Sequence, residues 1–146
     1  MKATFLLRRD HARILSSFEA CLHAEDDSRP AHFQRTRDLL LAHLRVEEDL
    51  YYPALETVPE LREAARHARE EHRDLRLELQ RFDGVTFNDT TLRLLHDLRD
   101  HFERHVETEE EDLFARSRRA LGDARIDELG RQIEARRLEL LEGAPA

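Results

Sequence analysis

The chain has 146 residues, 38% of them charged, with four Gly, four Pro and a single cysteine, Cys21. This length fits one domain of about 150 residues, and the lone cysteine excludes an internal disulfide framework and any cysteine-rich zinc or iron–sulfur site. The net charge of −8 and the even spread of arginines argue against a nucleic-acid partner.

The first helix is predicted over residues 4–25, after an opening whose apolar run of only three residues is too short for a signal peptide or a membrane span. We therefore expect a cytoplasmic protein without a membrane partner. Few turn residues and long amphipathic runs predict an all-α fold. The buried stripe of this first helix includes His11 among Leu7, Ile14 and Phe18.

The second helix is predicted from Pro30 to about Glu56, because proline suits a first helical turn. Its stripe carries His43 and Glu47. The third helix begins near Pro59, carries His72 and ends at residues 82–84. The fourth starts after Asn88 or Asp89 and runs to about residue 118, with His101, His105 and Glu109 on one side. A fifth, shorter helix over about 123–141 has no metal-ligand types on its apolar side.

Short connections between the first four helices predict an up-down-up-down antiparallel four-helix bundle over about 4–118, within one domain of residues 1–146. At 1.5 Å per residue, the histidines and glutamates on the four stripes then lie at similar heights, within about two helical turns. The fifth helix offers a surface for a homodimer contact.

Two His-x3-Glu pairs, His43 with Glu47 and His105 with Glu109, each place an imidazole and a carboxylate on one helix face. A buried carboxylate is costly unless it is paired or bound to a metal. Imidazoles and carboxylates without a thiolate suit Fe, Mn, Co or Zn, and this many donors suggest two ions. We predict as metal ligands His11, His43, Glu47, His72, His101, His105 and Glu109.

Two known metal motifs are absent from the sequence. No histidine follows a glutamate by three residues, which excludes a ferritin-like site, and no His-Glu-x-x-His occurs, which excludes a zincin protease.

Several other histidines and acids are predicted to be surface groups. His67 and His96 are predicted to face solvent, and so are the acids that follow or adjoin the ligands: Glu48, Glu110 and Glu111. His101 is either a ligand or a neighbour of the ligands. We predict that Tyr51 lies near the metals or at the edge of the bundle, and that Tyr52 points elsewhere.

The order of these motifs resembles the hemerythrin-like, or HHE, cation-binding family. It comprises His11, then His43-x3-Glu47 with Tyr52-Pro53, then His72, then His105-x3-Glu109 with Leu113-Phe114. The resemblance implies a four-helix bundle with a non-haem di-iron centre, in which the histidines are terminal ligands and the two glutamates bridge. Oxygen-carrying hemerythrins have a fifth histidine where this chain has Arg76, and His101 is a candidate for that role.

The resemblance implies a cytoplasmic protein that binds O2, NO or peroxide through two iron ions, with Zn or Mn as substitutes, for sensing, storage or stress response. Two alternatives stay open. One is a redox enzyme or iron-donating protein that turns over peroxide or NO, and the other is an interaction module that a metal stabilises without catalysis. The sequence leaves open whether the protein is an enzyme.

Overall fold

The computed structural model describes residues 1–142, so the last four residues of the predicted domain lie outside the described residues. All elements of the described part are helical, which confirms the all-α prediction. In chain order they are α1 (Ala3–Leu22), α2 (Arg29–Val46), the π-helical turn η1 (Glu47–Tyr51), α3 (Tyr52–Glu56), the 3-10 turn η2 (Pro59–Leu61), α4 (Arg62–Gln80), α5 (Asp89–Thr108), the π-helical turn η3 (Glu109–Leu113), α6 (Phe114–Leu121) and α7 (Asp123–Leu141).

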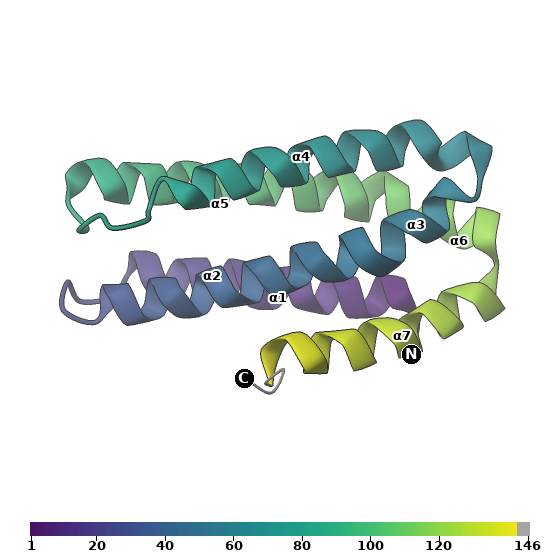
Figure 1. Ribbon diagram of the computed structural model, residues 1–146, viewed down its shortest axis with the longest axis horizontal. Coiled ribbons are helices and arrows are strands. Elements are labelled where there is room, and N and C mark those ends of the chain that lie inside the picture. Colours follow the sequence, from purple (N-terminus) through teal and green to yellow (C-terminus); the bar gives the residue numbers. More distant parts are fainter. Residues whose placement is uncertain (143–146) are drawn as a thin grey trace.

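The bundle consists of two antiparallel hairpins (Figure 1). α1 pairs with the rod formed by α2, η1 and α3, and this first hairpin spans residues 3–56; α4 pairs with the rod formed by α5, η3 and α6, and this second hairpin spans residues 62–121. Successive rods run in opposite directions, which confirms the up-down-up-down bundle. α7 turns back against α1 and α2. Its 19 residues equal those of α4, and it is shorter than α1 by one residue and shorter than the two composite rods.

A layer of buried polar side chains divides the apolar core into two clusters. On α1, Leu7 belongs to one cluster and Ile14 to the other, with the buried His11 between them. On α4, Ala68 and Leu75 flank the buried His72 in the same way. Each large apolar side chain that is fully buried stabilises the fold by about 1.5–3 kcal/mol, so the two clusters hold the polar layer in place. Within residues 1–142, no helix combines the length and hydrophobicity needed to cross a membrane.

The two π-helical turns are the main difference from the predicted helices. The backbone N–H of Tyr52 donates to the carbonyl of Glu47, and that of Phe114 donates to the carbonyl of Glu109, so each bond spans five residues instead of four. Each turn therefore contains one residue more than an α-helical turn. Beyond these points the faces of both rods rotate relative to a continuous α-helix.

Helix ends follow local hydrogen bonds. α1 ends at Leu22, three residues before the predicted end, because the buried Arg29 guanidinium donates to the carbonyls of Cys21 and Ala24. α5 begins after Asn88 as predicted, since Asn88 and Thr91 form a reciprocal capping box.

α7 approaches the start of the chain closely at Gly130. The buried face of α7 includes Ile126, Leu129 and Ile133, which join the apolar cluster around Leu7. A Cβ atom built on Gly130 would lie 1.9 Å from the backbone oxygen of Met1. Only glycine therefore allows this contact between helix and chain.

Gly130→Ala should destabilise the metal-free protein by about 1–3 kcal/mol because of overpacking. Helix propensity alone predicts the opposite sign, a gain of about 1 kcal/mol for alanine. Urea unfolding at neutral pH measures the difference, and Arg131→Ala, an exposed neighbour on α7, is the control with a change near zero. A Gly130→Ala variant as stable as wild type would contradict this docking of α7.

Candidate metal centre

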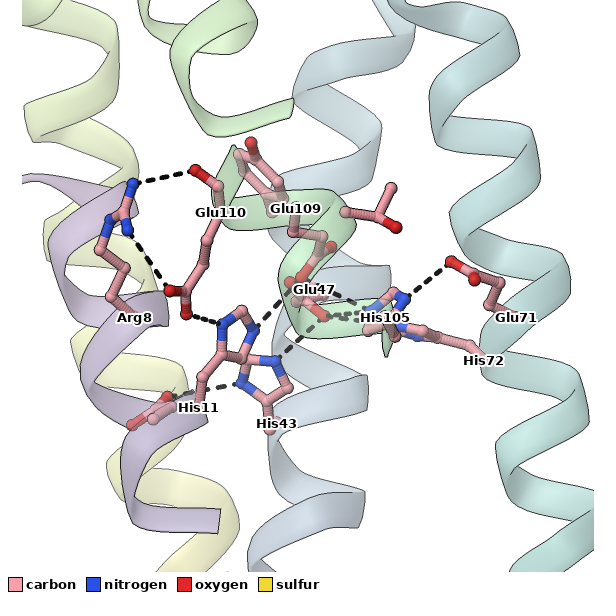
Figure 2. Close-up of polar contacts among 12 residues, drawn as sticks. Arg8, His11, His43, Glu47, Glu71, His72, His105, Glu109 and Glu110 are labelled. Carbon is pink, nitrogen blue, oxygen red and sulfur yellow. Dashed lines mark hydrogen bonds and ion pairs between the residues drawn. The ribbon is translucent and has the colours of Figure 1, made fainter. Parts of the chain in front are cut away.

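Six predicted ligands meet in the middle of the bundle, with one or more from each of the four rods. They are at most 2% exposed and are called here the inner cluster: His11, His43, Glu47, His72, His105 and Glu109. Figure 2 shows the imidazoles of His11 and His43 approaching Glu47 and Glu109 from one side, and those of His72 and His105 from the other. The inner cluster contains two sets of side chains whose donor atoms lie within 4.8 Å of one another.

The first group consists of His11, His43, Glu47 and Glu109. His11 Nε2 lies 3.2 Å from Glu109 Oε1, and His43 Nε2 lies 3.1 Å from Glu47 Oε1. Two ligands of one ion, each about 2.1 Å from it, are about 3 Å apart when they meet it at a right angle. The group therefore has the spacing and the donor types of one metal site.

The second group consists of Glu47, His72 and His105. The Nε2 atoms of His72 and His105 are 3.2 Å apart, and Glu47 Oε1 lies 3.1 Å and 3.6 Å from them, respectively. Glu47 belongs to both groups, so its carboxylate connects them.

Several buried polar atoms of the inner cluster lack a hydrogen-bond partner. These are His11 Nε2, both ring nitrogens of His43, Glu47 Oε2 and Glu109 Oε1. Buried polar atoms are almost always satisfied, since each one left unpaired costs stability. A bound cation would satisfy the carboxylate oxygens and the inward imidazole nitrogens, so these residues fit a metal.

Tyr52 also lies in the centre, contrary to the prediction that it points elsewhere. Its hydroxyl donates to Glu109 Oε2 at 2.6 Å and lies 2.9 Å from His72 Nε2 and 3.3 Å from Glu47 Oε1. The prediction counted α-helical turns from Glu47, but the π-helical turn η1 brings the fifth residue into line with it. Tyr51 is instead fully buried and hydrogen-bonds Ser117, so it lies neither in the inner cluster nor at an exposed edge.

The outer nitrogens of three histidines each face a carboxylate. His11 Nδ1 donates to Glu110 at 2.7 Å, His72 Nδ1 to Glu48 at 2.7 Å, and His105 Nδ1 to Glu71 at 2.9 Å. A carboxylate on Nδ1 fixes the ring and leaves the Nε2 lone pair directed inward, as in many metal sites. His43 has the weakest such contact, with Nδ1 3.8 Å from Asp10. We call these four acids the outer carboxylates: Asp10, Glu48, Glu71 and Glu110.

The prediction that Glu48 and Glu110 form a solvated face is therefore wrong, whereas Glu111 is exposed as predicted. Both acids directly follow an inner glutamate, and the π-helical turn directs each toward a histidine of the opposite hairpin. Arginine side chains hold them there, since Arg76 donates to Glu48 at 2.8 Å and Arg8 donates to Glu110 at 3.3 Å.

The remaining histidines lie outside the inner cluster. His101 pairs through Nδ1 with Glu78 and takes no part in either group, because it lies one helical turn, about 6 Å, from His105 along the rod. His96 is exposed and the His67 side chain is 62% exposed, as predicted. Of the seven predicted ligands, the structure thus brings six together and leaves out His101.

Charged neighbours oppose the effect of burial on the pKa values of His43 and Glu47. Burial alone lowers the pKa of His43, but Glu47 and Asp10 outweigh it and raise the pKa to about 10. Burial alone raises the pKa of Glu47, but His43, His105 and His72 hold it well below its usual range. In the absence of a metal, His43 is thus protonated at neutral pH, and a cation must displace that proton.

Comparison with known proteins agrees with the resemblance seen in the sequence. The family model described as the hemerythrin HHE cation-binding domain matches residues 2–117. A crystal structure of a hemerythrin HHE cation-binding domain-containing protein from Mycobacterium kansasii is similar, with a TM-score of 0.80 and 25% identity, over 96% of this chain and 87% of that chain. No curated protein matches the chain. The family match contains the inner cluster and ends before α7 begins.

The free energy of unfolding of the metal-free protein should fall as the pH rises from about 6.5 to about 10. His43 binds its proton more tightly in the folded protein, where its pKa is about 10, than in the unfolded chain, where it is 6.5. Its stabilising contribution is therefore fully present below pH 6.5 and is lost as the pH rises through 10.

Urea unfolding in the presence of a chelator, repeated across this pH range, measures the effect. His43→Gln should show a shallower decline than wild type, and His96→Gln, which changes an exposed histidine, should follow wild type. Equal slopes for His43→Gln and wild type would show that the pKa of His43 is not raised.

Proposed function

The chain belongs to the hemerythrin HHE cation-binding domain family, and we propose that it is a cytoplasmic di-iron protein that binds O2 or a related small oxidant. The observation that carries this proposal is the pair of buried donor groups sharing Glu47. Imidazole and carboxylate donors suit iron, and two adjacent ions explain why six ligand side chains are buried where four would hold one. Zinc or manganese can occupy the same donors.

The iron ions would supply coordination positions and electrons for a small oxidant. The protein would hold the ligands in place and enclose the centre. Glu110, Glu48 and Glu71 orient the imidazoles of the histidines that they bond: His11, His72 and His105. The two apolar clusters enclose the centre. A cavity of about 10 Å³ is lined by His43 of the inner cluster together with Asp10 and Arg137, and this is about the volume that one water molecule requires.

Tyr52 favours a second candidate, redox turnover of peroxide or NO. The phenol is fully buried and hydrogen-bonded to Glu109. Burial, Glu109 and Glu47 all raise the pKa of Tyr52 well above 10, so the hydroxyl keeps its proton. A protonated phenol beside a bound oxidant can donate a hydrogen bond, a proton or an electron. Cys21 takes no part, because it lies ten residues beyond His11 on α1, about 15 Å along the helix.

Protein loaded with Fe(II) and handled without oxygen should hold about two iron ions per chain, by the donor count above. Glu47→Ala should lose both ions because both groups share Glu47. Glu109→Ala removes a donor of the first group, and the Oε1 atom of Glu109 also lies 3.5 Å from His105 Nε2 of the second group. His96→Ala, an exposed change on the rod that carries His105, should retain both. Metal analysis and circular dichroism separate loss of metal from loss of fold.

Exposure of the reduced, loaded protein to O2 should change its visible absorption, and vacuum should restore the starting spectrum. An irreversible change with steady consumption of peroxide would instead support redox turnover. Binding of zinc alone, without a response to any of these oxidants, would contradict both proposals and favour an interaction module.

Tyr52→Phe should keep the metal content and lower the rate of peroxide consumption at least about tenfold, if the phenol transfers a proton. Tyr51→Phe is the matched control, since Tyr51 is equally buried but bonds Ser117. A Tyr52→Phe protein with an unchanged rate and spectrum would limit Tyr52 to a packing role.

A further inference from the structure

Arg137 interrupts the apolar face of α7 with a charge. The face runs through Ile126, Leu129 and Ile133 to Leu140, and Arg137 lies four residues after Ile133 on the same side. Its side chain is only 16% exposed, and its Nε donates to Asp10 Oδ1 at 3.0 Å. α7 thus presents a guanidinium group to the bundle where its pattern predicts an apolar residue.

Asp10 connects this arginine to the inner cluster. Asp10 is 5% exposed and precedes His11 on α1. Its Oδ1 accepts from Arg137, and its Oδ2 lies 3.8 Å from His43 Nδ1. The corresponding acid of the second hairpin, Glu71, precedes His72 and bonds His105 directly at 2.9 Å. Aspartate is shorter than glutamate by one methylene group, so Asp10 reaches its histidine less closely and depends more on what holds it.

We propose that Arg137 is a positioning residue for the metal centre, through which α7 fixes Asp10 and Asp10 orients His43. This inference rests on the proposed binding of metal by the inner cluster. It assigns a role to a helix that lies beyond the part of the chain matching the family model, which ends at residue 117.

The other charged neighbours of Asp10 do not replace Arg137. Arg13 lies 4.0 Å from Asp10 and its side chain is 45% exposed, so solvent weakens that contact. Glu134 does not compete strongly for Arg137, because its carboxylate lies 3.8 Å from the guanidinium, compared with 3.0 Å for Asp10. Without Arg137, His43 is the one buried cationic partner that the Asp10 carboxylate keeps among residues 1–142.

The proposal predicts an effect on one metal site only. His43 belongs to the first group, whereas the second group is formed by Glu47, His72 and His105. Loss of an interaction that orients a metal-bound histidine weakens metal affinity by about 10- to 100-fold. Arg137→Ala should therefore weaken one of the two binding events by this factor and leave the other unchanged.

Titration of the metal-free protein with Co²⁺, followed by visible absorption and by competition with a chelator, measures both events and reports the coordination of each ion. Arg136→Ala is the matched control, because Arg136 is the neighbouring arginine on α7 and pairs with Glu139 and Asp49 at the surface. Arg137→Lys should restore much of the affinity, since its ammonium can also donate to Asp10.

A double-mutant cycle distinguishes positioning from simple attachment of α7. If Arg137 acts through Asp10, then Asp10→Asn should weaken the same event, and Asp10→Asn combined with Arg137→Ala should be no weaker than the worse single variant. Additive effects, equal loss of both events, or wild-type affinities in Arg137→Ala would overturn the inference. Wild-type protein that binds no Co²⁺ would instead overturn the proposed function, so the two failures differ.

Discussion

Compensation of buried charge is the constraint on which this structure depends. The six ionisable side chains of the inner cluster lie in the bundle interior, where an isolated charge is costly and a charge whose partner has been removed is more costly still. The fold surrounds these side chains with successive layers of polar partners. Glutamates at the centre face imidazoles, the imidazoles face the outer carboxylates, and arginines hold three of these carboxylates, as Arg8 holds Glu110. The hydrophobic clusters above and below keep these layers in register.

Helical periodicity alone predicted the four rods and the six inner residues, because spacing on an α-helix determines which side chains share a face. It failed where the backbone departs from that period. Nothing in residues 47–51 or 109–113 signals a π-helical turn. A regular α-helical period therefore predicts the wrong face for Tyr52 and wrongly predicts solvated positions for Glu48 and Glu110. Arg137 did carry a signal, a charge between Ile133 and Leu140 on an apolar stripe, but such a signal does not identify its partner.

The two hairpins repeat the same design with an offset of about 62 residues, and their differences are as informative as their likeness. Arg8 and Arg69 occupy equivalent places, each over the ring that follows the π-helical turn, Phe114 or Tyr52. Phe114 stacks on His11 with its ring planes 9° apart, whereas Tyr52 places a hydroxyl beside His72. Phe114 thus presents a hydrocarbon ring to His11, whereas Tyr52 presents a hydroxyl group to His72, so the two donor groups have different surroundings.

The outer carboxylates that cross between hairpins have a consequence for how such a chain can be assembled. Glu48 of the first hairpin holds His72 of the second, and Glu110 of the second holds His11 of the first. Each hairpin thus supplies a carboxylate that orients a histidine of the other hairpin. A single hairpin of this design would be an incomplete unit, able to orient all its imidazoles only by associating with another hairpin.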